Sequence, residues 1–465
     1  MYQLQSRWVQ KDRKLIYYGM RSGKNLFRNK IKLSRRQADI ISSLPRELSR
    51  RECRALGRLM GTQVVEQDKV RAVPRSIREA VFCTGCSAND FIIPGLEFDS
   101  EGRCPMCQTA KEAEKLRSIV PIVTEIPRAK KSRFDVALFY TGGKDSTYLL
   151  YHLAKVKGLR VLALTWDIPF MSECAKQSIE NAKKHFPTVE FISRSVKEED
   201  MRRIYTKLYE LSENTCACPS LAYVLFYPEL VANRVPYFMA GNEPAQMLGL
   251  YYNHMAPKTA YKFPDSPLMQ FAVNAGRVLT LHPPLRRGQF HTLATMKQLT
   301  KKNGSRLSAM AGYKNELVSN IVAAISEVPE MTAPLKRAIR SSSWSGHIPA
   351  FVHLDFDRIS GGSYNWQQIK KLIVDECGWV APEDTAKGLH TSCKIEKCKE
   401  YSQFNRFYHC RSTMIPFSAL EISIASRSKN LTREEAVREM ESSLGFSLEE
   451  IPECRIMCGY LRDGR

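Results

Sequence analysis

From residue 134 onward, short apolar runs alternate with longer stretches whose apolar positions recur every three or four residues. The runs FDVALFY, RVLALTW, VEFISRSV and VPYFMAG have the length and composition of buried strands. Helical stretches follow the first two runs, at DSTYLLYHLAKVK and SECAKQSIENAKKHF. This alternation predicts an α/β domain with a doubly wound parallel sheet over residues 128–290. In such a sheet the turns after Tyr140, Trp166 and Ala240 line one crevice.

The first 80 residues have a different pattern, in which a β segment with a glycine-bearing turn precedes two helical stretches. The stretches SRRQADIISSL and SRRECRALGRLM each begin with a serine at an N-cap position and carry Gln or Glu three residues later. A strand-like QVVEQDKVRAV follows. This order predicts a winged-helix-like module over residues 1–80, a fold that binds DNA, RNA, peptides or a neighbouring domain.

After residue 290 the apolar spacing is mainly helical, as in FHTLATMKQLTKKN, NWQQIKKLIVDEC and TREEAVREMESSL. It predicts a helical C-terminal region over residues 291–465. No segment approaches 18 uncharged apolar residues, so we expect no membrane-spanning helix and no membrane partner. Because the N-terminus lacks the apolar core of a signal peptide, we expect a cytoplasmic protein in a reducing environment.

Charge narrows the class of partner. The 465 residues are 43% hydrophobic and 25% charged, which is typical of a globular protein and excludes a disordered or fibrous one. The net charge is +22, and residues 1–80 hold 20 basic and 7 acidic residues. An excess of this size attracts polyanions, so RNA, nucleotides or other acidic molecules are candidate partners. A basic surface that is merely solvated is the alternative, because few aromatic residues are interleaved.

Four of the 14 cysteines form two C-x-x-C pairs, Cys83 with Cys86 and Cys104 with Cys107, with 17 residues between the pairs. Paired knuckles at this spacing place four thiolates at the corners of a tetrahedron. They predict a structural Zn²⁺ ribbon over residues 81–112. An iron–sulfur cluster is the competing interpretation, because sequence does not distinguish these metals well.

The turn after the first predicted strand reads TGGKDS, at residues 141–146, and connects that strand to a helix. Two glycines let successive N–H groups point at an anion, the helix N-terminus adds partial positive charge, and Lys144 adds a full charge. The Walker A pattern does not fit, because Asp145 follows the Gly-Lys pair and Leu138 occupies the place of the first glycine. The turn predicts a phosphate site of a different kind.

The turn is similar to the S-G-G-K-D-S loop of the PP-loop ATP pyrophosphatases, also called adenine nucleotide α-hydrolases, with Thr141 replacing the first serine. Over residues 81–290 the chain most resembles the N-acetyl sugar amidotransferases, which begin with a cysteine ribbon containing a similar PGLEFDSEGRC insert. The resemblance implies a PP-loop/HUP-like fold. It also implies an enzyme that uses ATP and Mg²⁺ to transfer AMP to a carbonyl or amide oxygen, releasing pyrophosphate, before a nitrogen or sulfur nucleophile displaces AMP.

The resemblance also implies roles for the loop and for two further strand ends. Phosphates are expected at the residues Thr141, Gly142, Gly143, Lys144 and Ser146. Asp145 is expected to hold the metal ion or the loop geometry, with Lys144 and Asp145 both counted as catalytic. The adenylate crevice is expected to contain Asp167, Gly241, Asn242 and Glu243. A carboxylate that only satisfies helix amides is the alternative for Asp145.

The nucleophile stays open between nitrogen and sulfur. Nitrogen transfer is the prediction, and it implies a separate glutaminase subunit because the chain has no glutaminase signature. Sulfur transfer is the alternative, with a sulfur donor and with Cys216 and Cys218 as catalytic persulfide carriers or as ligands of an iron–sulfur cluster. Their C-A-C spacing departs from the C-x-x-C of thiolating relatives, and both cysteines could also be buried core residues at the start of a helix. The acceptor is expected to be RNA, a peptide or a sugar.

A second cysteine group near the C-terminus has irregular spacing. It contains Cys393, Cys398, Cys410, Cys454 and Cys458. This spacing fits a metal site and a set of buried thiols equally well. A third hypothesis for the whole chain is a nucleotide-sensing protein that binds RNA or peptide without turnover.

Overall fold

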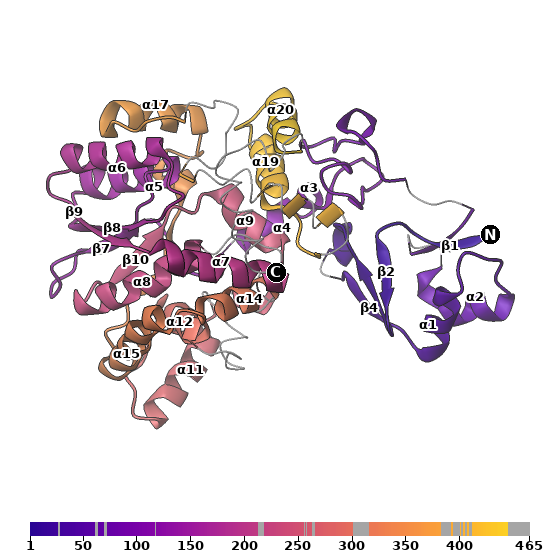
Figure 1. Ribbon diagram of the computed structural model, residues 1–465, viewed down its shortest axis with the longest axis horizontal. Helices are drawn as coiled ribbons and strands as arrows, with labels where there is room; N and C mark the ends of the chain where they lie inside the picture. The colour runs from indigo at the N-terminus through magenta and orange to yellow at the C-terminus, as the bar shows by residue number, and fades with distance from the viewer. Residues whose placement is uncertain are drawn as a thin grey trace. The chain divides into compact units, whose positions relative to one another are not determined.

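The computed structural model describes most of the chain, which divides into two compact units (Figure 1). The residues described are 1–26, 28–60, 64–68, 72–116, 118–212, 218–254, 256, 258–262, 266–300, 316–382, 392–393, 400, 403–404, 407–408 and 412–444. Unit 1 contains Met1–Ala113 and Gln403–Gly445, and unit 2 contains Glu114–Ser402.

Unit 2 is built on a five-stranded parallel sheet. Its strands are β7 (Val136–Phe139), β8 (Val161–Asp167), β9 (Glu190–Ser195), β10 (Tyr237–Ala240) and β11 (Ala350–Phe351). Their order is β11-β10-β7-β8-β9, and every neighbouring pair is parallel. The predicted α/β class is therefore confirmed, with a strand in each of the four predicted runs. The strand order reverses between β7 and β10, which makes their carboxyl ends the switch point of the sheet.

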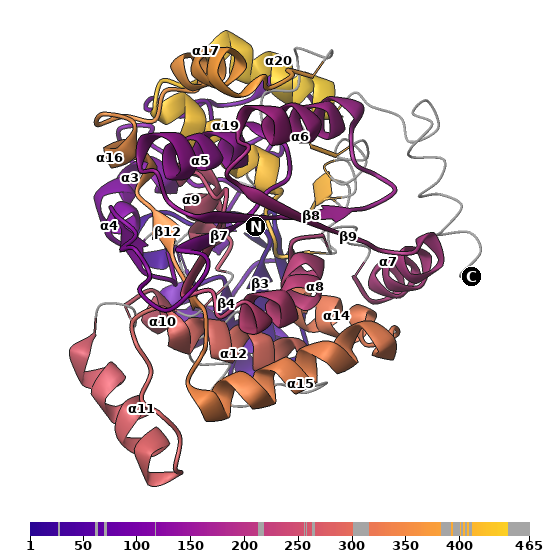
Figure 2. The same ribbon diagram turned by 90° about the vertical axis from the view of Figure 1, so that its left-hand side faces the viewer.

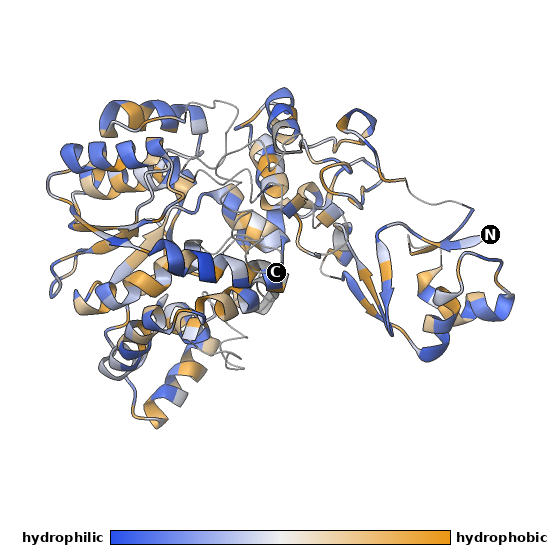
Figure 3. Ribbon diagram, in the orientation of Figure 1, coloured by the Kyte–Doolittle hydropathy of each residue, from blue (hydrophilic) through white to orange (hydrophobic). Residues whose placement is uncertain are grey.

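Helices cover both faces of this sheet (Figure 2). One face carries α5 (Lys144–Tyr151), α6 (Glu173–His185) and α17 (Trp366–Cys377), and the other carries α8 (Cys218–Ala232), α12 (Gln289–Thr300) and α15 (Pro329–Ser345). Because both faces are covered, the central strand β7 and the first part of β8 are apolar and buried, whereas the edge strand β9 carries polar residues and is partly exposed (Figure 3). All four residues of β7 are buried.

In the described part of the chain, unit 2 also contains six further helices and two short strands that the sequence pattern did not predict. The helices are α7 (Glu198–Ser212), α9 (Pro244–Tyr252), α10 (Lys258–Lys262), α11 (Pro267–Leu279), α14 (Glu316–Ile325) and α16 (Phe356–Ile359), and the strands are β6 (Ile122–Val123) and β12 (His353–Leu354). β12 pairs with β6, and β11 extends the main sheet, although both β11 and β12 lie in the region expected to be helical. Two residues are too few to show an alternating pattern. Among the described residues, no helix has the length and apolar character to cross a membrane.

A buried carboxylate anchors the start of β7. Asp135 is fully buried, and it accepts hydrogen bonds from Ala129 N at 2.6 Å and from Arg160 N at 2.9 Å. The Arg160 guanidinium lies 2.6 Å from Asp135 Oδ1. Burial alone would raise the pKa of Asp135, but these hydrogen bonds outweigh burial and the pKa is lowered.

Unit 1 begins with a small β-and-helix module. Its strands are β1 (Tyr2–Leu4), β2 (Trp8–Lys11), β3 (Lys14–Tyr17), β4 (Lys30–Lys32) and β5 (Val65–Gln67), and its helices are α1 (Arg35–Ser42) and α2 (Arg50–Leu56). β2, β3 and β4 form an antiparallel meander, and β1 pairs with β5. Both predicted capping boxes are confirmed, at Ser34 with Gln37 and at Ser49 with Glu52. The winged-helix assignment stays a prediction.

The rest of unit 1 surrounds the cysteine ribbon. It contains α3 (Pro105–Gln108), the start of α4 (Ala110–Lys115), α19 (Phe417–Arg427) and α20 (Arg433–Leu444), which lies near α19 in Figure 1. A buried ion pair at 3.3 Å joins Arg21 of the module to Glu97 of the ribbon. The hydroxyl of Tyr17 also donates to the carbonyl of Gly95 at 2.6 Å. The module and the ribbon are therefore packed as one body.

The Asp135 anchor gives a stability prediction. We expect Asp135→Asn to lower the free energy of unfolding by about 2 kcal/mol near neutral pH, because Arg160 and two buried amides lose a charged partner. The folded-state pKa of Asp135 is lowered, so this stabilisation is fully present above the unfolded pKa of about 4 and is lost as pH falls through the folded value. Urea unfolding at several pH values measures it. Asp375→Asn, at an exposed position of α17, is the control and should change little.

Candidate functional site

The turn between β7 and α5 lies at the switch point of the sheet. Gly142 has a φ of +70°, and a Cβ atom on it would lie 2.4 Å from the carbonyl oxygen of Ala175 at the start of α6. Conformation and space both require glycine here. On its other side the indole of Trp379 donates a hydrogen bond of 3.1 Å to the carbonyl of Gly142. The predicted phosphate loop is thus fixed from two directions.

Two hydroxyl groups close this turn from within. The Oγ1 of Thr141 and the Oγ of Ser146 lie 3.2 Å apart, and Ser146 Oγ donates to the carbonyl of Gly143 at 3.1 Å. The amide of Gly143 donates to Thr141 Oγ1 at 3.4 Å, and the amide of Thr141 donates to Ser146 Oγ at 3.3 Å. The hydroxyl of Thr141 therefore helps to close the loop from within.

Lys144 and Asp145 begin α5 and form a buried ion pair. Lys144 Nζ lies 2.5 Å from Asp145 Oδ1, with 4% of Lys144 and 9% of Asp145 exposed. The hydroxyl of Tyr364 donates to the same carboxylate oxygen at 2.6 Å and accepts from Lys144 Nζ at 3.3 Å. Burial, followed by the charge of Asp145, raises the pKa of Tyr364 well above its ordinary value. The phenol therefore keeps its proton and acts as a donor.

The strand ends named from the sequence contribute unequally to this site. Gly241 follows β10 so closely beside α5 that a Cβ atom on it would lie 2.7 Å from the amide nitrogen of Ser146. Asn242 forms a tight turn, with its amide donating to Ala240 O at 2.8 Å, and the buried Glu243 caps α9 by accepting from Gln246 N at 3.3 Å. Asp167 is exposed at the end of β8. Gly241 thus meets the loop directly, whereas the side chain of Asp167 faces solvent.

Three aromatic residues at this site were missed by the sequence analysis. Tyr364 and Trp366 enclose the ammonium of Lys144, whose Nζ lies 4.8 Å and 4.7 Å from the two ring centres, and Trp379 binds the turn as described. The sequence offered one signal, the doublet Gly361-Gly362 just before this aromatic pair. Both glycines have positive φ, at +89° and +115°.

The cysteines proposed for sulfur chemistry are only partly described. Cys216 lies outside the described residues, and Cys218 begins α8, with a side chain that is also outside them. Of the C-terminal group, Cys398, Cys410, Cys454 and Cys458 lie outside the described residues, but Cys393 forms a β-bridge with Met171. Met171 is three residues before Cys174, and Cys174 precedes the Ala175 that touches the phosphate loop. Cys174 is therefore next to a residue that touches the loop, and Cys393 pairs with the segment just before α6.

In unit 1 the four cysteines of the ribbon come together. Cys83 Sγ lies 3.7 Å from Cys107 Sγ, Cys86 Sγ lies 3.6 Å from Cys104 Sγ, and all four sulfurs are within 4.8 Å of one another. A single tetrahedral ion with metal–sulfur bonds of about 2.3 Å requires sulfurs about 3.8 Å apart. The spacing therefore fits one metal ion, and it is short for a cluster in which each thiolate binds a different iron.

The electrostatics of these thiols also favour a bound cation. Hydrogen bonding with Cys104 first, and then with the other thiols, lowers the pKa of Cys83, whereas the same neighbours raise the pKa of Cys86. Four thiolates this close repel one another unless a positive ion compensates them. Backbone amides already point at the sulfurs, with Gly85 N donating to Cys83 at 3.3 Å and Ala88 N donating to Cys86 at 3.4 Å. These two amides would stabilise negative charge on Cys83 and Cys86.

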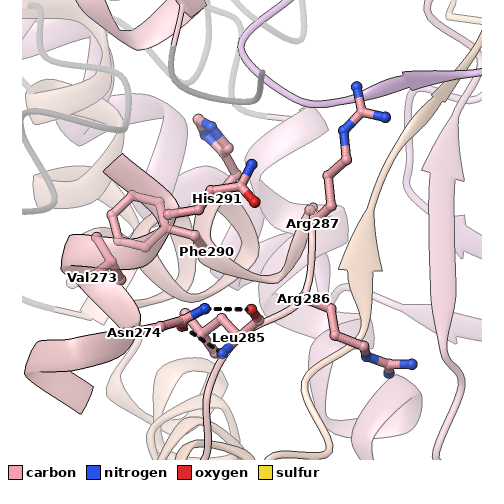
Figure 4. Close-up of a pocket in the computed structure, with 9 residues that line it drawn as sticks. Val273, Asn274, Leu285, Arg286, Arg287, Phe290 and His291 are labelled. Carbon is pink, nitrogen blue, oxygen red and sulfur yellow. Dashed lines mark hydrogen bonds between the residues drawn. The ribbon is translucent and has the colours of Figure 1, made fainter. Parts of the chain in front are cut away.

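A small cavity in unit 2 lies between α11 and α12 (Figure 4). Asn274 closes one side through two hydrogen bonds with Leu285, of 3.0 Å and 2.7 Å, while Arg286 and Arg287 extend in different directions. None of the loop residues 141–146 lines it. The cavity is separate from the phosphate loop and adds nothing to that site.

Comparison with known proteins gives one solved structure to consider. No family model matches the chain, and no curated protein matches it. Among solved structures the chain is similar to the U34-tRNA thiolase NcsA from Methanococcus maripaludis with its 4Fe-4S cluster, at 14% sequence identity. The match covers 57% of this chain and 88% of that chain, with a TM-score of 0.24. Because this overlap is so loose, the functional assignment depends on the residues described above.

The four-cysteine site predicts one metal ion per chain. Elemental analysis of protein purified without oxygen should find about one ion per chain, and Cys104→Ser should release it, because a tetrahedral site with three thiolates is left open. Cys53→Ser, in α2 and outside the site, is the matched control and should retain the metal. A wild-type chain without metal would overturn the assignment, and iron with acid-labile sulfide would replace the single ion by a cluster.

Proposed function

We propose that this chain is an ATP-dependent enzyme that adenylates a carbonyl or amide oxygen and releases pyrophosphate. The observation that supports this most strongly is the turn at 141–146, because it lies at the switch point of a parallel sheet, where ligands of such sheets bind. Gly142 and Gly241 pack so closely against neighbouring backbone that neither position leaves room for a side chain near the N-terminus of α5. That helix end attracts anions, and Lys144 adds a full positive charge beside it.

In the adenylation step, each residue of the loop has a separate role. The acceptor oxygen attacks the α-phosphorus of ATP, and the bond from this phosphorus to the bridging oxygen breaks, so pyrophosphate leaves with the bonding electrons. Lys144 and the first amides of α5 stabilise the charge on that leaving group. Asp145 offers the carboxylate oxygen that Mg²⁺ prefers, and bound Mg²⁺ would share the phosphate charge. Gly241 and Glu243 lie where the rest of the nucleotide would extend.

For the second step we propose nitrogen, in the manner of the N-acetyl sugar amidotransferases. Ammonia attacks the adenylated carbon, AMP leaves with the original oxygen, and a base removes the extra proton from nitrogen. The resemblance of the ribbon and the loop supports this choice. Ammonia would come from a separate glutaminase subunit.

Sulfur transfer is a second candidate, favoured by the position of two cysteines. Cys393 is held beside Met171, with Ser172 N donating to Ser392 O at 3.2 Å, and Cys174 lies in the first turn of α6 beside the phosphate loop. In this version the terminal sulfur of a persulfide attacks the adenylated carbon and displaces AMP. The second thiolate then breaks the sulfur–sulfur bond, and an external thiol reduces the resulting disulfide.

The acceptor that we propose is a polyanion such as RNA, because of the outer face of the β2–β4 meander. On this face Lys14 stands opposite Lys11 on one side and Lys32 on the other, with Lys30 next along β4. Like charges directly opposite one another destabilise a sheet, so a bound polyanion would relieve their repulsion. The three strands carry no acidic residue. A lone sugar acceptor would gain nothing from this face.

In the ribbon we propose zinc as the bound ion. The four ligands are all sulfur, the spacing fits one tetrahedral ion, and the sulfurs of Cys83, Cys86 and Cys104 belong to buried residues. A closed four-thiolate set leaves no coordination position for a substrate, which supports a structural role.

The proposed function predicts ATP-dependent release of pyrophosphate that depends on Lys144. Lys144→Met keeps the aliphatic stem but removes the charge, so we expect turnover to fall at least about a hundredfold, the typical effect of removing one group that stabilises developing charge. Pyrophosphate release with added ammonia and RNA or amide acceptors measures it. Lys155→Met, at the end of the same helical segment and paired with Glu376, is the control and should retain activity. A chain that binds nucleotide but never releases pyrophosphate would favour the nucleotide-sensing hypothesis.

The sulfur candidate predicts a separate result. If sulfur is transferred, Cys174→Ser and Cys393→Ser should each abolish the thiolated product while ATP-dependent adenylation continues, because both thiols act after AMP transfer. Mass spectrometry of the product and pyrophosphate release give the two readouts. Cys53→Ser is the control. Full thiolation in both variants would exclude this pair, and an aminated product in the wild type would exclude sulfur transfer.

A further inference from the structure

The side chain of Lys144 is buried and enclosed in this structure. Its ammonium meets the Asp145 carboxylate, the Tyr364 hydroxyl and the faces of two aromatic rings, and 4% of the residue is exposed. Two of the three donors of this ammonium are used by Asp145 and Tyr364, and two rings lie beside it, so little of the ammonium is left to contact a phosphate. Binding a nucleotide therefore requires these contacts to change.

Tyr364 is carried by a short connection between two anchored helices, and Trp366 is the first residue of the second helix. On one side, α16 ends at Ile359, whose carbonyl accepts a hydrogen bond of 2.9 Å from the hydroxyl of Tyr148. On the other side, Asn365 caps α17 by accepting from Gln368 N at 3.0 Å. Between them, Gly361 and Gly362 have positive φ and open space where their Cβ atoms would be.

Glycines in open space at positive φ can change conformation without steric conflict. The stretch from Gly361 to Tyr364 is therefore the part of this connection that is able to move while both helices stay in place. Three backbone amides hold it in the observed position: Tyr364 N donates to Asp357 Oδ1 at 3.0 Å, Gly362 N to Asp357 O at 2.7 Å, and Gly361 N to Arg358 O at 3.3 Å. The Tyr364 ring also packs on Phe356, with 4.7 Å between the ring centres, so all these contacts must change together. Movement here would carry the Tyr364 ring away from Lys144.

We propose that Tyr364 is a positioning residue of the nucleotide site, which holds Lys144 against Asp145 at rest and releases Lys144 and Asp145 when a magnesium–nucleotide enters. Lys144 then exchanges the carboxylate for a phosphate, and Asp145 exchanges the ammonium and the phenol for the metal ion. This exchange leaves no buried charge unpaired, which is the condition for moving an ion pair inside a protein. The inference rests on the proposed function of the loop.

A resting contact of this kind lowers nucleotide affinity, because part of the binding energy is used to open it. Tyr364→Phe removes the hydroxyl that binds Asp145 but keeps the ring. We therefore expect this variant to bind magnesium–ATP and inorganic pyrophosphate about tenfold more tightly than the wild type, the effect of removing one hydrogen bond to a charged group. Isothermal titration calorimetry on the full chain measures both ligands.

A spectroscopic signature separates this role from a merely structural one. Trp366 stays in α17 with its ring centre 4.7 Å from Lys144 Nζ, so withdrawal of the ammonium from this ring should shift the tryptophan emission of the wild type when magnesium–pyrophosphate is added. The shift should be absent in Trp366→Phe. It should persist in Trp344→Phe, a control at a residue that is already 58% exposed.

The outcomes distinguish this inference from the proposed function itself. If the wild type binds neither magnesium–ATP nor pyrophosphate, the proposed function fails. If the wild type binds them but Tyr364→Phe binds equally or more weakly, the phenol is not a resting restraint and the inference is overturned while the function stands. An emission shift that survives in Trp366→Phe would also overturn it.

Discussion

The N-terminus of α5 is held between two stretches of backbone that reach it without side chains, and the geometry of the candidate site depends on this constraint. The end of β10 approaches at Gly241, and the start of α6 approaches at Gly142. Any Cβ atom at either position would meet backbone that cannot move aside, because it belongs to the sheet and its helices. The absence of side chains at Gly142 and Gly241 therefore allows the switch point of the sheet, the start of α5 and the loop at 141–146 to pack closely together.

The same close packing explains why a charged pair is buried there. Taking Lys144 and Asp145 out of water is expensive, and their mutual attraction compensates only when further hydrogen bonds complete the pair. Tyr364 supplies such a bond, and its raised pKa keeps it a donor. The pair is therefore stable while it is intact. A ligand that brings both a phosphate and a cation can replace each partner with one of the same sign, whereas a simple anion would leave Asp145 uncompensated.

The sequence predicted this fold best where a local pattern was complete within a few residues. Buried parallel strands such as β7 are apolar throughout, and helix starts such as Ser34 and Ser49 carry their own capping partners. The features that the sequence did not predict are too short to show a pattern or join residues far apart in the chain. β11 has two residues, and Tyr364 reaches Asp145 across 219 positions of the chain. Such contacts are set by tertiary packing, so neither spacing nor composition reveals them.

The C-terminal helices give the ribbon a second layer of support that bears on the role of its metal. Arg433 of α20 donates to the carbonyls of Cys83 and Cys86 at 2.8 Å and 3.3 Å, and Arg427 of α19 donates to the carbonyl of Met106 at 2.9 Å. Partners beyond the ligands hold a metal site in one geometry. An ion in this closed set would join only residues 83–107, whereas Arg433 joins the same loops to a helix more than 300 residues later, and both features fit a structural role in unit 1 better than substrate binding.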